Sequence, residues 1–343
     1  MLSDLFPSTL TNIQYQYKPP GTAQFSLGIQ RQVASSVIAV MQYVGTLGWT
    51  QNNDRGINTL PLTDSLNTAN PYDLRQGVAT GKLNANLYRN FPGFSSIQQE
   101  ENETNFSFNA LEIGLRMENK HGLTFQVAYT YSHEIDSQSN DLGGVSNPYN
   151  IAYDRGSGAL DRRQIFNVNY IYAAPWFTKS GNAFERIALG GWELSGVTFV
   201  QSGVPQPINY NGADTLGLGG GTANRPNKIA GITYPKTRLA WFNKSAFAAP
   251  TAPWVSSANG NQGWGNAGKD QVILPGLFNF NMALFKTFSF TEALKFQFRL
   301  ETFNTFNHTE FNGIDSGFND GNFGQVTSAY DPRVLQLGGK LSF

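Results

Sequence analysis

The feature that most constrains the fold is a set of segments in which apolar and polar side chains alternate residue by residue. Successive side chains of a β-strand point to opposite faces, so such a segment predicts a strand with one apolar and one polar face. The clearest example, residues 123–132, reads LTFQVAYTYS. About nine segments have the ~9–11 residues or more of a transmembrane strand: 22–32, 37–46, 104–118, 123–132, 163–174, 192–201, 277–289, 294–305 and 333–343.

The connections between these segments alternate between short and long. The long ones cover about 47–103, 135–162, 202–276 and 306–332. Short turns on one rim and long loops on the other are typical of bacterial transmembrane barrels, whose long loops lie outside the cell. A sandwich or a propeller has no reason to alternate in this way. The sequence therefore predicts an all-β fold, an antiparallel transmembrane β-barrel with long extracellular loops.

Composition excludes several other classes of protein. Lys+Arg and Asp+Glu each number 24 among the 343 residues, so there is no basic excess for binding nucleic acid. Cysteine is absent, which excludes disulfides, thiol catalysis and thiolate metal sites. No run of about 18 apolar residues is present, so we expect no transmembrane helix. None of these features points to a cofactor.

The strand count predicts that the barrel is partial. Complete bacterial barrels have an even number of strands and begin and end in the periplasm. Nine strands that end in the periplasm must begin at an extracellular loop. Residues 1–7 also lack the basic region and apolar core of a signal peptide. We therefore expect about nine to ten strands of a larger barrel, in a truncated chain that belongs in the outer membrane.

The C-terminal residues 336–343, QLGGKLSF, have a special pattern. They resemble the C-terminal signal of outer-membrane barrels, in which a polar residue, a glycine, a hydrophobic residue and a terminal aromatic residue follow one another at set spacings. The matching positions are Gln336, Gly338, Leu341 and Phe343. This resemblance implies that the barrel-assembly machinery of the outer membrane recognises the last strand.

Several longer motifs occur in a characteristic order. They are FSLGIQR at 25–31, LTFQVAYTYSH at 123–133, DRRQIF at 161–166, NRPN at 224–227, WFN at 241–243, FRLETFNTFNH at 298–308 and the ending from 322 to 343. Together they resemble the Oar-like TonB-dependent receptors, which are large outer-membrane proteins.

The resemblance implies a barrel of about 22 strands, preceded by a signal peptide, a carboxypeptidase-regulatory-like domain and a plug. The signal peptide, the regulatory-like domain and the plug are not in this sequence. The implied role is binding or uptake of an extracellular ligand. The implied partners are outer-membrane lipid, the missing N-terminal barrel half and plug, and an energising inner-membrane complex that is reached only through the plug. The chain alone is not expected to transport.

Two groups of residues are candidates for functional positions. Charged side chains on the polar faces of strands are expected to face the barrel lumen and tune its selectivity; these are Glu112, Arg116, Lys295, Arg299 and Glu301. Three tryptophans fall in the loop 202–276: Trp241, Trp254 and Trp264. They could stack on a carbohydrate or peptide ligand, or they could pack the loop against the barrel mouth.

The remaining chemistry favours a non-enzymatic protein. The three histidines show no metal-binding spacing. The acidic cluster Glu100, Glu101 and Glu103 is interpreted as a solvated loop or a cation-attracting mouth rather than as a glycosidase pair. Two alternatives remain open. One is a small independent porin or adhesin barrel, and the other is a soluble carbohydrate-binding β-sandwich.

Overall fold

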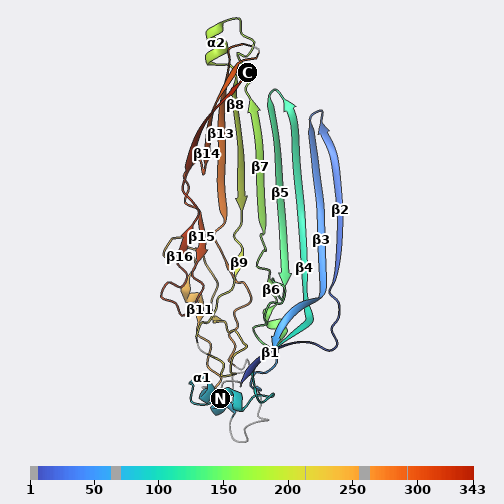
Figure 1. The fold of residues 1–343 in the computed structure, drawn as a ribbon, viewed down its shortest axis with the longest axis vertical. Helices are drawn as coiled ribbons and strands as arrows, with labels where there is room; N and C mark the ends of the chain where they lie inside the picture. The colour runs from blue at the N-terminus through green and yellow to red at the C-terminus, as the bar shows by residue number, and fades with distance from the viewer. Residues whose placement is uncertain (1–6, 63–70, 213, 255–262, 292) are drawn as a thin grey trace.

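A computed structural model describes residues 7–62, 71–212, 214–254, 263–291 and 293–343. Its main sheet runs in the order β17-β14-β13-β8-β7-β5-β4-β3-β2, and each of these neighbouring pairs is antiparallel (Figure 1). The bounds are β2 Gly21–Ala34, β3 Val37–Gly56, β4 Phe94–Lys120, β5 Leu123–Asp136, β7 Gln164–Ala173, β8 Trp192–Gln201, β13 Leu277–Ser289, β14 Lys295–Phe303 and β17 Val334–Ser342.

The remaining elements are short. They are β1 Ser8–Ile13, β6 Gly156–Ser157, β9 Pro205–Gln206, β10 Asn227–Lys228, β11 Phe247–Ala248, β12 Val272–Ile273, β15 Phe311–Ile314, β16 Val326–Ala329, α1 Pro71–Ala79, α2 Ala183–Ala188 and the 3₁₀ turns Ala85–Leu87, Ile151–Asp154 and Lys244–Ala246. Strand β1 pairs with β4 in parallel, and β6 pairs with β5. Within the described ranges, no helix is long and apolar enough to cross a membrane.

The predicted all-β, antiparallel architecture is confirmed, and each of the nine predicted segments corresponds to one strand of the main sheet. Two boundaries were wrong. Strand β3 continues to Gly56 and β4 begins at Phe94, so the connection between them is 57–93 rather than 47–103. Apolar alternation stops in these extensions, but the backbone ladder continues, for example from Asn53 to Glu101. The hydrogen bonds of the backbone, and not the side-chain pattern, determine where these strands end.

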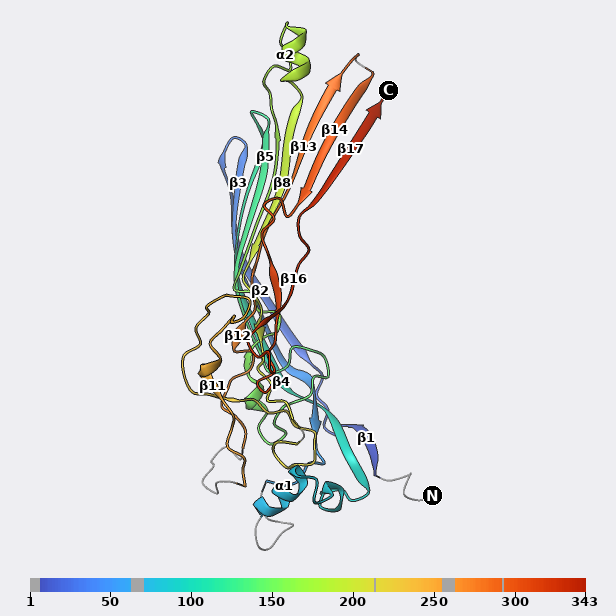
Figure 2. The same cartoon turned by 90° about the vertical axis from the view of Figure 1, so that its left-hand side faces the viewer.

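The sheet is open. Strands β2 and β17 lie at its two ends, and in the described part of the chain neither pairs with the other. Figure 2 shows the sheet from the side as a bent wall whose two ends diverge toward the turns. This is the arrangement expected of part of a barrel.

The short and long connections separate to opposite ends of the sheet. The turns at 35–36 and 121–122, the C-terminal end of β13, the N-terminal end of β14, helix α2 and the C-terminus lie at one end (Figure 1). The connections that carry α1, β6, β9–β12 and β15–β16 extend from the other end. We call these ends the turn rim and the loop rim. Their separation follows the pattern of outer-membrane barrels, in which the turn rim is periplasmic.

Register sorts the side chains into two faces. One row of paired residues crosses the sheet from Arg116 through Gln126, Asn169 and Val197 to Asn281. On the opposite face of the sheet, another row of paired residues consists of Ile29, Met41, Ile113, Tyr129, Phe166, Val200 and Phe278. We call these the polar face and the apolar face.

The apolar face is exposed over much of its area. Ile29 is 67% exposed, and on β17 Leu337 and Leu341 are 69% and 58% exposed. The soluble-sandwich alternative requires these side chains to be buried under a second sheet. The sheet order contains no such layer among the described residues. An exposed apolar surface of this kind is suited to contact with lipid.

Several glycines in the sheet lie beneath an aromatic ring of the neighbouring strand. Gly45 is paired with Phe25, and Gly196 is paired with Tyr170. A Cβ atom at Gly45 would lie 2.3 Å from the Phe25 ring, and one at Gly196 would lie 2.5 Å from the Tyr170 hydroxyl. The missing side chain therefore makes room for the ring of the neighbouring strand.

We expect Gly196→Ala to destabilise the assembled sheet by about 1–3 kcal/mol, because the new methyl group must displace Tyr170. Gly114→Ala is the matched control, since a Cβ atom there meets nothing closer than 3.8 Å. The midpoint of heat-induced unfolding, followed by gel mobility, should fall for Gly196→Ala and change little for Gly114→Ala. Equal midpoints for the two variants would contradict this account.

Candidate functional site

The connections at the loop rim fold into a compact unit, which we call the loop cap. It consists of the described residues within 57–93, 137–163, 202–276 and 304–333. Two hydrophobic clusters stabilise it. The first contains Ile208, Trp241, Phe242, Ala246, Phe247, Ala267, Val272, Ile314 and Phe323, and the second contains Leu60, Leu74, Leu216, Leu218 and Trp264. The buried apolar core of this chain therefore lies in its loops, and the loops have a defined shape.

The three loop tryptophans occupy different environments. Trp241 is 8% exposed and its Nε1 donates a 2.8 Å hydrogen bond to the Ile273 carbonyl. Trp264 is 2% exposed and meets Tyr149 edge to face at 6.4 Å between ring centroids. In this structure these two side chains therefore pack inside the loop cap, which is the alternative to ligand contact. Trp254 is half-buried, and its role in ligand contact stays a prediction.

A buried ion pair connects two of the loops. The Arg225 guanidinium pairs with the Asp154 carboxylate and lies 3.8 Å from the centroid of the Tyr153 ring. Arg225 also donates hydrogen bonds to the carbonyls of Tyr153 and Ala267. Burial raises the pKa of Tyr153 to about 12. Arg225 belongs to the sequence motif NRPN, and the structure shows that it fixes the positions of 151–154 and 263–267 within the cap.

A second charged group lies where β5 enters the cap. Lys269 forms an ion pair with Asp136 and donates to the Ser139 hydroxyl at 3.1 Å. The neighbouring Asp270 is 6% exposed, and burial raises the pKa of its carboxyl to about 6. Lys269 therefore neutralises one carboxylate at the junction of sheet and cap, and it partly offsets the burial of the next.

A polar cavity of about 280 Å³ lies beside this group. Its lining contains Pro20, Gln51, Asn52, Thr104, Asn105, Phe106, Glu134, Asp136, Gln138, Ser139, Asn140 and Asp141. Asn52 donates from Nδ2 to the Asp141 carboxylate at 3.1 Å and accepts from the Tyr17 hydroxyl at 3.0 Å. Amide and carboxylate groups, together with one aromatic ring, can hold a ligand that presents many hydrogen-bond donors.

Sequence reasoning did not find this cavity, although a signal was present. Polar runs at 51–54 and 138–141 continue two regular strands into the cap. The acidic cluster was interpreted wrongly at one position. Glu101 is fully buried and accepts a 2.6 Å bond from Arg55, so it is neither solvated nor part of a mouth. At this position β4 pairs with the extension of β3 at the loop rim, and the carboxylate is shielded from water.

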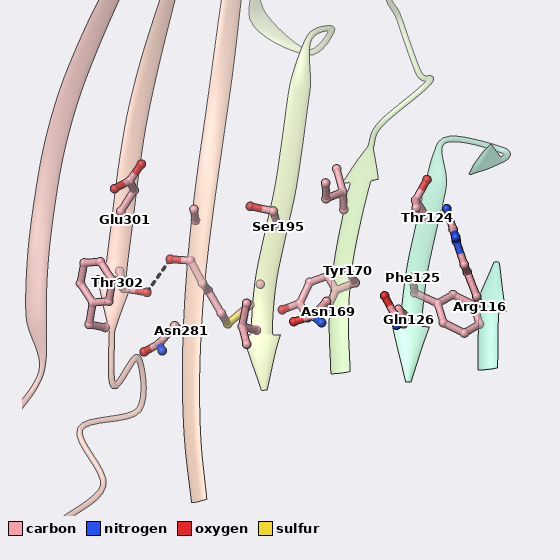
Figure 3. Close-up of a pocket in the computed structure, with 16 residues that line it drawn as sticks. Arg116, Thr124, Phe125, Gln126, Asn169, Tyr170, Ser195, Asn281, Glu301 and Thr302 are labelled. Carbon is pink, nitrogen blue, oxygen red and sulfur yellow. Dashed lines mark hydrogen bonds between the residues drawn. The ribbon is translucent and has the colours of Figure 1, made fainter. Parts of the chain in front are cut away.

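The polar face carries a separate, shallower groove of about 720 Å³ (Figure 3). Its lining consists of Arg116 on β4 and of triplets on β5, β7, β8, β13 and β14, in which the outer two residues belong to the polar face. Arg116 and Glu301 lie at opposite ends of the groove. The groove shows that the polar face is the concave one at this level.

The five predicted lumen charges share this polar face. Strand pairing puts the side chains of Glu112 and Arg116 on the same face as Gln126. It puts those of Lys295, Arg299 and Glu301 on the same face as Ala283, which is again the polar face. Their assignment to a water-filled lumen stays a prediction.

Two of the histidines have carboxylate partners. His133 Nδ1 lies 3.0 Å from Asp161, and His308 Nδ1 lies 2.7 Å from Glu310. In the described residues, no three or more His, Cys, Asp or Glu side chains form a group that could hold a metal ion. These pairs fix the ends of strands and loops.

The residues of the predicted assembly signal lie on the edge strand β17. Gln336 pairs with Glu301, Gly338 pairs with Arg299 and Leu341 pairs with Phe296. Phe343 is 98% exposed at the turn rim. Strand β17 is therefore hydrogen-bonded to β14 along one edge and lies at the end of the sheet. Recognition by the assembly machinery stays a prediction.

These features define an outer-membrane β-barrel: an antiparallel sheet with an apolar and a polar face, short turns on one rim and a folded cap on the other. The chain belongs to the outer membrane beta barrel domain family, whose model matches residues 2–336. This confirms the predicted outer-membrane location. No curated protein sequence matches the chain.

One solved structure gives the same answer for the fold. The outer-membrane transporter YddB from Escherichia coli superposes with a TM-score of 0.53 at 12% identity, over 99% of this chain and 34% of that one. The ferric-catecholate import receptor Fiu from E. coli K12 gives 0.45 at 10% identity, over 96% and 29%. The ferripyoverdine receptor of Pseudomonas aeruginosa gives 0.41 at 11% identity, over 94% and 27%.

The chain thus spans about a third of the length of these proteins. The outer-membrane barrel that the sequence motifs predict is confirmed.

Proposed function

We propose that this chain is the C-terminal part of the barrel of an Oar-like TonB-dependent receptor, and that its loop cap binds an extracellular ligand. One observation carries this proposal: an open sheet with nine long antiparallel strands bears a folded cap, and a polar cavity lies between the cap and the strand ends at the loop rim. Buried ion pairs and two hydrophobic clusters fix the shape of these loops. Loops of fixed shape suit a receptor, because pre-organisation lowers the entropy cost of binding.

The lining of the cavity indicates the class of ligand. Amide side chains and carboxylates accept hydrogen bonds from hydroxyl groups, and Phe106 supplies an apolar surface on which a sugar ring can pack. Glu134 and Asp141 disfavour an anionic chelate by charge repulsion. We therefore propose a neutral, hydroxyl-rich glycan as the ligand. This role is binding, without catalysis.

Uptake requires parts that the resemblance places outside these 343 residues. A plug inside the barrel would contact the energising inner-membrane complex, and further strands would pair with β2 and β17. The five polar-face charges would then line the passage around the plug. The barrel-assembly machinery would recognise β17 through Gln336, Gly338, Leu341 and Phe343. In this proposal, residues 1–343 alone do not transport.

Glycan binding can be measured on the assembled protein by calorimetry, with linear glucans and chito-oligosaccharides as probes. We expect Glu134→Gln combined with Asn140→Ala to weaken binding by roughly tenfold or more, which corresponds to about 1.4 kcal/mol per tenfold. Gln126→Ala, in the groove of the polar face, is the control and should bind normally. Absence of binding for every probe, or equal binding by the cavity variant, contradicts a glycan site in this cavity.

Residues 1–343, expressed behind a secretion signal, are expected not to insert stably, since an open sheet leaves unpaired backbone groups facing lipid. The measurement is a search of outer-membrane fractions for a heat-modifiable, protease-resistant band. Such a band from this chain alone would overturn the partial-barrel proposal. Cross-linking would then show whether the alternative, a small barrel closed by several copies, is correct.

A further inference from the structure

The connection between β7 and β8 differs from the others at the turn rim. It spans 174–191 and contains α2, whereas β2–β3 and β4–β5 are joined by two residues each. Antiparallel strands need only a tight turn to connect them. The additional residues of this connection, which we call the rim hairpin, are therefore not required to join the strands.

The rim hairpin exposes large apolar side chains. Phe184 and Ile187, which are three residues apart on α2 and so lie on one side of it, are 74% and 48% exposed. Trp176, Phe177 and Leu189 are 61%, 44% and 47% exposed. Five such residues within one short connection form an apolar patch that is unfavourable in water and typical of an interaction surface.

Three contacts attach the rim hairpin to the apolar face of the sheet. The Trp176 ring meets the Tyr172 ring edge to face, with 5.8 Å between centroids. Trp192 donates from Nε1 to the Ala188 carbonyl at 3.2 Å. Lys286 donates from Nζ to the carbonyl of Gly190. The side chains of Tyr172, Trp192 and Lys286 all lie on the apolar face.

Lys286 indicates the level of the membrane boundary. It is 3% exposed, and its ammonium lies 5.3 Å from the ring centroid of Trp192 and 5.0 Å from that of Phe288. A charge on the lipid face costs several kcal/mol at the bilayer midplane but little near the interface. Aromatic rings and lysine side chains also accumulate at that interface. The hairpin begins where the hydrocarbon ends.

We infer that the rim hairpin is an interfacial membrane anchor that binds glycerophospholipids of the periplasmic leaflet. Phe184 and Ile187 insert among the acyl chains, and the exposed cations Lys179 and Arg186 contact lipid phosphates. Helix α2 projects beyond the strand ends at the turn rim (Figure 2), where the headgroup layer borders the hydrocarbon. The inference rests on the family and the orientation of the sheet, and it is independent of any ligand bound by the cap.

Spin labelling tests this anchor, because the chain contains no cysteine and a single label has no background within it. The spin label is attached to the new cysteine of the Phe184→Cys variant. The protein used is the form that assembles in the outer membrane. This protein is then reconstituted in vesicles of phosphatidylethanolamine and phosphatidylglycerol. We expect the label to collide more often with oxygen, which concentrates in lipid, than with a water-soluble nickel complex. Ser35→Cys, in the β2–β3 turn of the same rim, is the matched control and should show the opposite preference.

Two outcomes overturn the anchor. In the first, the label at Phe184→Cys is as open to nickel as the control label. In the second, the label is shielded from both reagents in native outer-membrane vesicles but open to nickel in pure lipid, which indicates a periplasmic protein partner instead. A normal heat-modifiable band for the labelled variant establishes that the barrel itself is intact.

Discussion

The constraint on which the structure depends is that hydrocarbon cannot hydrogen-bond to a peptide group. Every backbone N–H and C=O within the membrane must find its partner in the protein. Nine antiparallel strands meet this condition everywhere except along the outer edges of β2 and β17. Once the backbone hydrogen bonds between the strands are fixed, successive side chains of each strand point alternately toward lipid and toward the concave polar face. A mean hydropathy of −0.32 is compatible with this arrangement, because half of each strand faces the polar side.

The strands could be predicted because their signal is local. In 123–132 the alternation alone identifies both faces, and β5 carries it through that segment. The same reasoning failed for 47–56 and 94–103, where apolar and polar side chains no longer alternate regularly. There the pairing of Asn53 with Glu101 continues the ladder into the cap, and Arg55 neutralises the buried carboxylate. A pattern based on hydrophobicity contains no information about that pairing.

The cap was beyond sequence reasoning because its contacts join distant positions. Arg225 meets Asp154 across 71 residues, and the cavity combines side chains from around 51, 105 and 138. Loops have no period that would place Trp241 and Trp264 inside rather than outside. The proposals give the parts of the chain separate roles: the sheet meets lipid, the loop cap binds the ligand, and the rim hairpin anchors the turn rim in the periplasmic leaflet.

The central claim is that the two faces of the sheet meet different solvents, and β5 offers the most direct test. Single cysteines at 124, 126, 128 and 130 and at 125, 127, 129 and 131 can be challenged with a membrane-impermeant maleimide in assembled protein. The account predicts reaction at the even positions, which belong to the polar face, and protection at the odd positions, which face lipid. Protection of both sets, or the reverse alternation, would contradict it.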